Sequence, residues 1–344
     1  MRLFKRDRSK KMPAFIGPLF AVLVLAMILA ITNDRFLYIA NIMNILRQTS
    51  INALIALGML MVMLTGGIDI SVGSISVLSG CVMGVLMKSG VSSDVVLILA
   101  GLMTGILCGT LNGMLFTQME LPHPFVSTMG TLMIFRGLAL FITGAAPISG
   151  FGSGVLFLGY SNVFTVIPAS FVLVIVFYII MSVFLNRTAL GRKIYTVGGN
   201  QEAARLSGIS VKKTLNFTYI MSGFMASVAG IVLIGRISSA SPIANETANM
   251  DAIASCVVGG TSFLGGKGTV AGVLVGAMLI GVINNGLDLL GAQTDVKFMV
   301  IGAVIIGAVF LDVVRNKAEE KSRRLAQAKA MGDLEAGKDG LTIG

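Results

Sequence analysis

The chain contains little of what soluble enzymes commonly depend on. Its 344 residues include one histidine, three cysteines and no tryptophan, and only 12% are charged, whereas an ordinary soluble domain holds about 25% charged residues. Cys81, Cys108 and Cys256 stand singly in apolar stretches, so we expect buried thiols rather than a metal or redox site. The lone His123 cannot form a metal cluster. We therefore expect no catalytic residue, no metal and no cofactor in this chain.

A nucleotide-binding loop is also missing. The stretch VVGGTSFLGGKGTV, residues 257–270, has the glycines and the lysine of a phosphate cradle. A P-loop, however, requires glycine five residues before Gly266 and a hydroxyl residue directly after Lys267. Those positions hold Thr261 and Gly268. The chain is therefore not expected to bind ATP itself.

The sequence is rich in long apolar segments. Hydrophobic residues make up 55% of it and glycines number 42, and the mean hydropathy is +0.89. A helix needs about 20 apolar residues to cross the hydrocarbon layer. The predicted fold is an all-α, polytopic membrane protein with about ten transmembrane helices. They are expected at 14–33, 48–64, 70–87, 95–118, 124–143, 162–185, 215–234, 251–263, 269–287 and 298–311. The span 251–263 is short enough to be re-entrant.

Basic residues predict the orientation. Nineteen of the 26 lysines and arginines lie in three regions, residues 1–11, the loop 186–213 and the tail from Asp312. With ten spans, all three regions fall on the cytoplasmic side, as the positive-inside rule requires. The net charge of +10 then reflects topology, and no nucleic acid partner is implied. The predicted organisation is a basic cytoplasmic N-terminus (1–12), a transmembrane domain (13–314) and a charged cytoplasmic tail (315–344), with the tails facing solvent or membrane lipid. No A-x-A-like cleavage site follows the first span, which is expected to be retained.

Two charged side chains within or beside the spans have two interpretations each. Asp69, in the segment TGGIDISVGS (65–74), either caps a helix that begins near Ile70 or takes part in ion or substrate passage. Arg136, thirteen residues into its span, either binds a structural partner such as a backbone carbonyl or lines a pathway.

Glycines recur at every fourth residue from Gly101 to Gly113, which places them along one helix face. Such a stripe is typical of close helix packing, and a moving seam is the other interpretation.

The loop 186–213 contains the pattern of a short capped helix. Asn200 is a favoured N-cap, Glu202 lies in the first turn, Arg205 lies near the end, and Gly208 suits a left-handed C′ position. So short a helix is marginal alone. It is expected to pack either on this protein or on a cytoplasmic partner.

Four long motifs in the correct order resemble the membrane permeases of the ribose-type ABC monosaccharide importers. They are NILRQTSINALIALGM, LTGGIDISVGS, LGRKIYTVGGNQEAARLSGI and MDAIASCVVGGTSFLGGKGTVAGVLVGAMLIGVINNGL, between about Ile31 and Val314. The resemblance implies an importer permease of the bacterial inner membrane, with both termini cytoplasmic. It also implies three partners: a cytoplasmic ABC ATPase that binds the ATP and Mg²⁺, a periplasmic sugar-binding protein, and a second permease chain that is identical or related.

The resemblance also assigns roles to residues. The segment matching 198–209 is the family's coupling helix, whose candidates here are Asn200, Glu202, Ala203, Ala204, Arg205, Leu206 and Gly208. Polar groups that could lie along a sugar path are Asn52, Thr65, Asp69, Ser71, Ser74, Asn112, Arg136 and Asn284. The sugar stays open. An alternative function is an ion-coupled secondary transporter with Asp69 or Asp251 as its ion site.

Overall fold

The structure is a computed structural model that describes residues 15–119, 121, 123–163, 166–310, 313–314 and 317. The predicted segment 1–12 and nearly all of the predicted tail 315–344 lie outside the described residues. The helices are α1 (Ile16–Thr32), α2 (Ile39–Leu64), α3 (Val72–Lys88), α4 (Asp94–Thr117), α5 (Pro124–Thr143), α6 (Ser153–Tyr160), α7 (Ala169–Arg187), α8 (Ala189–Gly199), α9 (Gln201–Leu206), α10 (Val211–Ile237), α11 (Ala248–Val258) and α12 (Val270–Leu289). Residues 294–310 are also helical. The strands are β1 (Ile148–Ser149), β2 (Asn162–Val163), β3 (Ile167–Pro168) and β4 (Ser239–Ala240).

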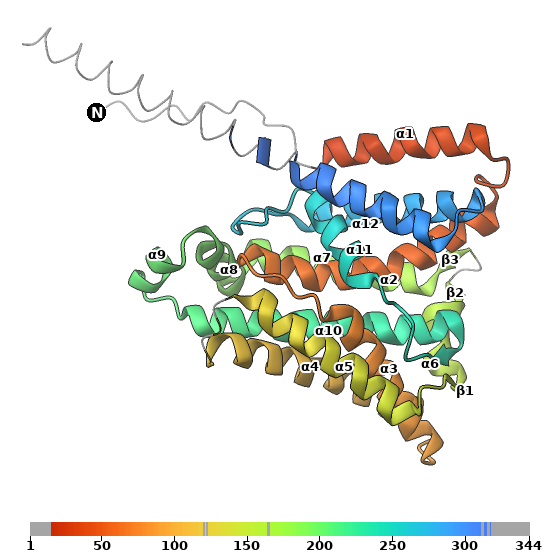
Figure 1. Ribbon diagram of the computed structural model, residues 1–344, viewed down its shortest axis with the longest axis horizontal. Coiled ribbons are helices and arrows are strands. Elements are labelled where there is room, and N and C mark those ends of the chain that lie inside the picture. The colour runs from red at the N-terminus through yellow and green to blue at the C-terminus, as the bar shows by residue number, and fades with distance from the viewer. Residues whose placement is uncertain are drawn as a thin grey trace, which may run out of the picture.

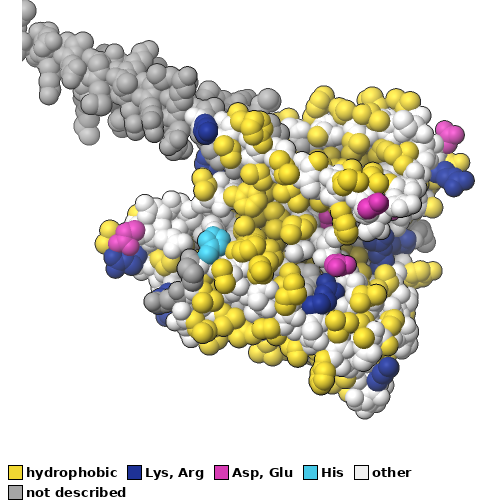
Figure 2. All heavy atoms as spheres, in the orientation of Figure 1, with side chains coloured by type: hydrophobic (Ala, Val, Ile, Leu, Met, Phe, Trp, Pro, Cys, Tyr) yellow, Lys and Arg dark blue, Asp and Glu magenta, His cyan; other side chains and the backbone are white. Residues whose placement is uncertain are grey.

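The predicted all-α membrane fold is confirmed. Within the described residues, six helices are long and apolar enough to cross a bilayer, and three shorter apolar helices accompany them. With the helical residues 294–310, they correspond one to one to the ten predicted spans. In Figure 2 hydrophobic side chains cover much of the visible surface, and many of the charged ones lie toward its edges.

Two of the ten predicted spans begin seven or more residues away from their predicted starts, and the other boundaries differ by five residues or fewer. The sixth begins at Ala169 instead of residue 162, because β2 and β3 pair as a small hairpin that ends at Pro168. The second begins at Ile39, nine residues before the predicted start. Arg47 lies within this helix, and its guanidinium donates hydrogen bonds to the carbonyl of Tyr160 and the side chain of Asn162.

The centre of the molecule is formed by α2 and α10 (Figure 1). Side chains from Ala53 to Leu64 of α2 are buried without interruption. α10 packs against α2, α3, α4 and α6, and α2 in turn packs against α7, α11 and α12. A membrane helix buried on all sides is apolar all round. This is why the sequence of α2 shows a continuous apolar run rather than a stripe.

The glycine stripe of α4 packs directly on α10, which confirms the interpretation of close packing. A Cβ added at Gly105 would collide with the backbone of Gly223, and one at Gly109 would collide with the backbone of Tyr219. Backbones that approach this closely exclude any side chain larger than hydrogen, as in other small-residue membrane interfaces.

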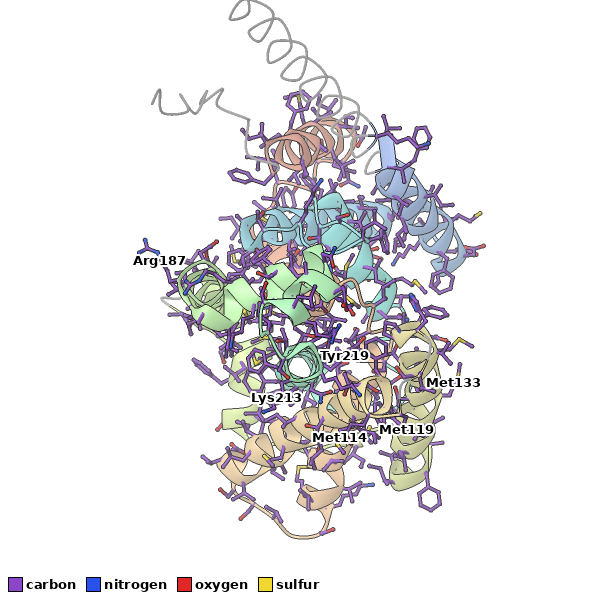
Figure 3. All side chains as sticks on the ribbon, turned by 90° about the vertical axis from the view of Figure 1, so that its left-hand side faces the viewer. Met114, Met119, Met133, Arg187, Lys213 and Tyr219 are labelled. Atoms are coloured by element: carbon purple, nitrogen blue, oxygen red, sulfur yellow. The ribbon has the colours of Figure 1, made fainter. Side chains whose placement is uncertain are left out.

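The molecule has two distinct ends. The end formed by α8 and α9 lies at the left of Figure 1, and the end formed by the strands lies at the right, where β1 pairs with β4 and β2 with β3. Figure 3 looks onto the α8–α9 end, where Arg187 extends outward and Tyr219 lies in the interior. The three cysteines are buried and free, as predicted.

Candidate functional site

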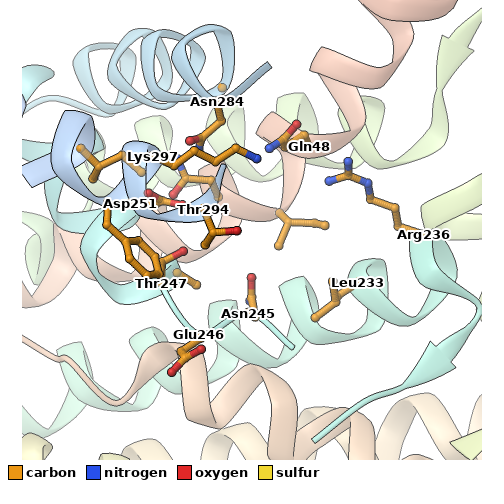
Figure 4. A pocket seen from close by; sticks show the side chains of 16 residues that line it. Gln48, Leu233, Arg236, Asn245, Glu246, Thr247, Asp251, Asn284, Thr294 and Lys297 are labelled. Atoms are coloured by element: carbon orange, nitrogen blue, oxygen red, sulfur yellow. The ribbon is translucent and has the colours of Figure 1, made fainter. Parts of the chain in front are cut away.

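A cavity of about 320 Å³ lies between α2, α10, α11, α12 and the helical residues 294–301 (Figure 4). Ligand pockets in proteins have volumes of about 300–1,000 Å³. Ten of the sixteen lining residues are polar or charged: Gln48, Asn52, Arg236, Asn245, Glu246, Thr247, Asp251, Asn284, Thr294 and Lys297. So polar a lining is unusual inside a membrane protein, where unpaired polar groups are costly.

Three acceptor atoms in this lining are buried and have no hydrogen-bond partner: Oε1 of Gln48, Oδ1 of Asn52 and Oδ1 of Asp251. The amide nitrogen of Asn52 donates to Oγ of Ser255 at 2.8 Å. Since this bond occupies the nitrogen side of the amide, the oxygen of Asn52 is the atom left for a ligand. The cavity thus offers acceptors to a molecule that brings its own donors.

The charges around the cavity are balanced. Asp251 and Glu246 contribute two acids, and Arg236 and Lys297 contribute two bases. Arg236 donates to the side chain of Asn44 at 3.3 Å, and Lys297 forms an ion pair with Asp288. An uncharged ligand therefore fits this lining without leaving a net charge buried.

α11 is only half a span, and its beginning faces the cavity. It has 11 residues, too few to cross the hydrocarbon layer, which takes about 20. The non-helical residues 241–247 cover the remaining distance from the strand end. Thr247, Ala248 and Asp251 of this helix N-terminus line the cavity. Broken helices that end at a polar cavity are a recurring feature of transporter binding sites.

Arg136 holds the segment that leads into α11. Its guanidinium donates to the carbonyl oxygens of Pro242 and Ala244, both at 2.9 Å. Of the two predicted interpretations, the geometry shows the bond to backbone carbonyls, and Arg136 does not line the cavity. Because the same segment presents Asn245 and Glu246 to the cavity, Arg136 supports one wall of it from behind.

Asp69 lies in a separate polar cluster that is closed to solvent. Its Oδ1 accepts hydrogen bonds from the backbone nitrogen of Ser71 (3.1 Å) and from the hydroxyl of Ser71 (2.6 Å), and its Oδ2 accepts one from Ser222 (2.9 Å). Asn112 donates to the Ser71 hydroxyl at 2.8 Å and accepts from Thr131 at 2.6 Å. The cluster joins α3, α4, α5 and α10.

The predicted helix start at Ile70 is therefore wrong by two residues. α3 begins at Val72, and Ser71 occupies the N-cap position. Asp69 does accept a backbone N–H, but it does so two residues ahead, as in an Asx turn. Its remaining lone pairs bind side chains from other helices, which the local sequence could not reveal.

The eight predicted path residues thus separate into groups. Asn52 and Asn284 line the cavity, and Arg136 supports one of its walls from behind. Asp69, Ser71 and Asn112 belong to the closed cluster. Thr65 and Ser74 are buried away from the cavity, and Thr65 donates to the carbonyl of Val62. Their roles in transport stay predictions.

Several lining residues were missed, although the sequence carries a signal for them. Gln48 and Asn52 are four residues apart on α2, and so are Thr247 and Asp251 on α11. Four-residue spacing places each pair on one helix face. Two polar residues on one face of an otherwise apolar span could have indicated a cavity wall.

The short capped helix in the loop 186–213 is confirmed as α9. The Asn200 side chain accepts from the backbone nitrogen of Ala203 at 2.9 Å, and Gly208 has a φ of +78°. Glu202 and Arg205 pair with each other at 2.5 Å, and the hydrogen bond from Arg205 holds the pKa of Glu202 below its ordinary value. Leu206 is 76% exposed, whereas the predicted contact Ala204 is buried against Val197 and Leu215 and so is not available to a partner. The preceding helix α8, capped by Thr188, was not predicted.

Within the described part of the chain, no group of three His, Cys, Asp or Glu side chains could hold a metal ion. His123 caps α5, since its Nδ1 accepts a hydrogen bond from the backbone nitrogen of Phe125 at 3.1 Å.

Comparison with known proteins identifies the family. Residues 41–309 match the family described as "Branched-chain amino acid transport system / permease component". The chain belongs to this permease family. It is 41% identical to the ribose import permease protein of Bacillus subtilis over 86% of this chain and 92% of that protein. It is 39% identical to the D-allose transport system permease protein of Escherichia coli over 91% and 98%, and 36% identical to the fructose import permease protein of Rhizobium meliloti over 87% and 85%. No solved structure matches the chain.

Membership of the family has direct consequences. The permease is the multi-pass, non-catalytic transport subunit of an ABC importer, a class of bacterial membrane proteins. Such permeases carry no cofactor, and the partner ATPase binds the ATP. The importer also implies a binding protein as a second partner. The chain is therefore a subunit of an ATP-driven importer and not the ion-coupled secondary transporter that the sequence left as an alternative.

Proposed function

We propose that this permease conducts a monosaccharide across the bacterial inner membrane through the cavity at Asn52, Asp251 and Asn284. The observation that carries the proposal is the set of three buried, unpartnered acceptors in the cavity, at Gln48, Asn52 and Asp251. A sugar presents several hydroxyl donors on a compact, uncharged ring. It would satisfy these acceptors at once, and each buried acceptor otherwise costs about 1–3 kcal/mol.

The cavity suits a sugar better than a branched-chain amino acid. A branched aliphatic side chain would require an apolar pocket, whereas ten of the sixteen lining residues are polar or charged. The relatives named above are permeases for ribose, D-allose and fructose, which supports the same substrate class.

The proposed orientation places the α8–α9 end in the cytoplasm and the strand end in the periplasm. The loop 186–213 carries six basic residues, and the positive-inside rule assigns such loops to the cytoplasm. α9 would then dock on the ATPase, with Asn200, Glu202, Ala203, Arg205 and Leu206 as contacts and Gly208 as its C-terminal stop. Both termini would be cytoplasmic, two permease copies would form the path, and the exposed apolar helix faces would contact lipid or the second copy.

The test is an assembly and hydrolysis experiment. The permease would be co-expressed with the ATPase and binding protein from its own gene neighbourhood, purified through a tag on the permease, and placed in proteoliposomes. ATP hydrolysis and uptake would be measured with D-ribose, D-allose, D-fructose and L-leucine. We expect hydrolysis and uptake to rise with one of the sugars and not with leucine. Stimulation by leucine alone, or uptake that follows an ion gradient without the ATPase, would overturn the proposal.

The coupling role of α9 has its own test. Exchanging the charges, Glu202→Arg together with Arg205→Glu, restores an ion pair within the helix while reversing what a partner meets. We expect unchanged membrane insertion and reduced retention of the ATPase during purification. Unchanged sugar uptake in this double variant would contradict the assignment.

A further inference from the structure

A second apolar side chain is displayed at the α8–α9 end. Leu264 is 80% exposed and stands at the tip of a tight turn. Within that turn the backbone nitrogen of Ser262 donates to the carbonyl of Lys267 at 2.9 Å, and the nitrogen of Gly265 donates back to the carbonyl of Ser262 at 3.2 Å. Gly265 and Gly266 have φ values of +82° and +69°, which residues with a side chain rarely adopt. The glycines of the stretch 257–270 thus fix the shape of a turn that presents Leu264.

The turn of residues 262–267 is hydrogen-bonded to the end of α2 and to α8. The backbone nitrogen of Gly266 donates to the carbonyl of Leu64 at 2.8 Å. A Cβ added at Gly198 would collide with that same carbonyl, so the end of α8 lies directly against the end of α2. The hydroxyl of Tyr195 donates to the carbonyl of Gly268 at 2.9 Å. α8 is followed directly by α9. The turn 262–267, α8 and α9 are therefore held together by backbone contacts, and we call these three segments the platform.

Leu264 and Leu206 of the platform, which are more exposed than Leu190 of α8, both lie outside the spans. Leu206 follows the charged pair of α9, and Leu264 lies between the end of α11 and the start of α12. A membrane-facing leucine would continue the apolar face of a span. The residues before Leu264 are Thr261, Ser262 and Phe263, and those after it are two glycines and a lysine; Phe263 is partly buried against the core, so Leu264 is the exposed apolar side chain of the turn. Single exposed leucines are common on protein surfaces. What distinguishes Leu264 is that its turn is hydrogen-bonded to the ends of α2 and α8 and is thereby held beside the proposed docking helix α9.

We propose that the turn 262–267 is a second docking element for the ATPase, with Leu264 inserting into an apolar depression of that subunit beside α9. The inference rests on the proposed docking of α9 and extends it. The turn joins α11 to α12, which carry Asp251 and Asn284 of the cavity. Movement of the ATPase then reaches the cavity helices directly through the turn, as well as through α8 and the end of α2.

Site-specific photocrosslinking in the assembled complex tests the inference. A benzophenone amino acid would replace Leu264, Leu206 or, as a control, Ile243, which is 72% exposed at the opposite end of α11. We expect crosslinks to the ATPase from positions 264 and 206 and none from position 243. Crosslinks from 206 alone, with 264 linking only to lipid, would overturn the second contact and leave the proposed function intact. Absence of crosslinks from both positions in a complex that still purifies would overturn the docking of α9 as well.

A functional measurement complements the crosslinks. In the full complex, Leu264→Glu is expected to lower sugar-stimulated ATP hydrolysis by about tenfold, which corresponds to about 1.4 kcal/mol of lost docking energy. Leu264→Met keeps an apolar side chain of similar volume and is expected to retain activity. Ile243→Glu is the matched control for an exposed charge. Equal activity of Leu264→Glu and the native complex would contradict the inference.

Discussion

Asp69 and Asp251 are two acids within one membrane domain, and their surroundings are opposite. Asp69 is fully buried, and its two oxygens accept hydrogen bonds from the backbone of Ser71 and from the hydroxyls of Ser71 and Ser222. Asp251 lines a cavity and leaves Oδ1 without a partner. A buried acid whose acceptors are all used has nothing to offer a ligand. The comparison teaches that hydrogen-bond satisfaction, rather than burial alone, separates a structural acid from a binding one.

The difference follows from what each acid joins. The Asp69 cluster connects α3, α4, α5 and α10 where these helices already pack at backbone distance, as at Gly109 and Gly223. A fully satisfied network there fixes the relative positions of the helices. Asp251 lies in the first turn of the half-helix α11, which follows a non-helical segment, and the helices around it leave a cavity.

Removing Asp69, the acid of the closed cluster, should have the largest effect on the stability of the permease. In Asp69→Ala, the buried donors of Ser71 and Ser222 lose their acceptor, and each unpaired donor costs about 1–3 kcal/mol. We expect loss of the monodisperse permease after detergent extraction, measured by size-exclusion chromatography. Asp69→Asn keeps one acceptor oxygen and should give an intermediate yield. A normal yield of Asp69→Ala with abolished uptake would show that Asp69 belongs to the transport path.

Removing Asp251, the acid that lines the cavity, should leave the fold intact and impair transport. Asp251→Ala deletes a carboxylate whose Oδ1 has no partner and which is otherwise hydrogen-bonded to Asn284, so the thermal unfolding temperature in detergent should change far less than in Asp69→Ala. Sugar uptake in proteoliposomes should fall by about tenfold or more, because a hydrogen bond to a charged acceptor contributes about 1.5–3 kcal/mol. If Asp251→Ala loses stability to the same extent as Asp69→Ala, the comparison fails.

Substituting Arg136, which supports the cavity wall from behind, should reduce transport less than substituting Asp251. Arg136→Leu frees the carbonyls of Pro242 and Ala244, which loosens the segment leading to α11. We expect an unfolding temperature lower by a few degrees and a sugar KM raised about threefold, consistent with a positioning role worth about 1 kcal/mol. Both hydrogen bonds come from one nitrogen, Nη1, so Arg136→Lys, whose ammonium also carries several donors, should have a smaller effect than Arg136→Leu. An unchanged KM with kcat reduced would place Arg136 in the transport step itself.

One peripheral bond of the closed cluster should give the smallest effect. Ser222→Ala removes one of the donors to Asp69, at a cost of about 1 kcal/mol. The unfolding temperature should drop by about 2–4 °C, with uptake unchanged. Ser227→Ala, whose hydroxyl donates only to the carbonyl of Phe224 on the same helix, is the matched control. A drop in uptake specific to Ser222→Ala would connect the closed cluster to transport.

Much of this architecture was predictable, because hydrophobic length and glycine spacing report directly on membrane helices. The capped helix α9 was predicted from Asn200 and Gly208, since caps depend on neighbouring residues. The hairpin before α7 was not, because its residues are apolar enough to extend a span. The start of α2 was misplaced because the partner of Arg47 lies more than a hundred residues away.

The candidate site was likewise predictable only where local sequence decides the outcome. Polar residues could be selected from the sequence, but whether each one is satisfied depends on side chains from other helices. Ser71 and Asn112 resembled path residues until Thr131 and Asp69 were seen to use their hydrogen-bonding groups. Gln48 was overlooked because it lies beside Arg47, at a position taken for the edge of a span.

Cysteine accessibility in the working importer tests the central contrast most directly. The three native cysteines would be replaced by alanine, and a single cysteine introduced by Thr247→Cys at the cavity or by Ser74→Cys, a buried position away from it. Modification by a water-soluble thiol reagent would be followed with and without the transported sugar. The account predicts that Thr247→Cys reacts and is protected by the sugar, while Ser74→Cys stays unmodified. Sugar-sensitive modification of Ser74→Cys, with Thr247→Cys inert, would contradict it.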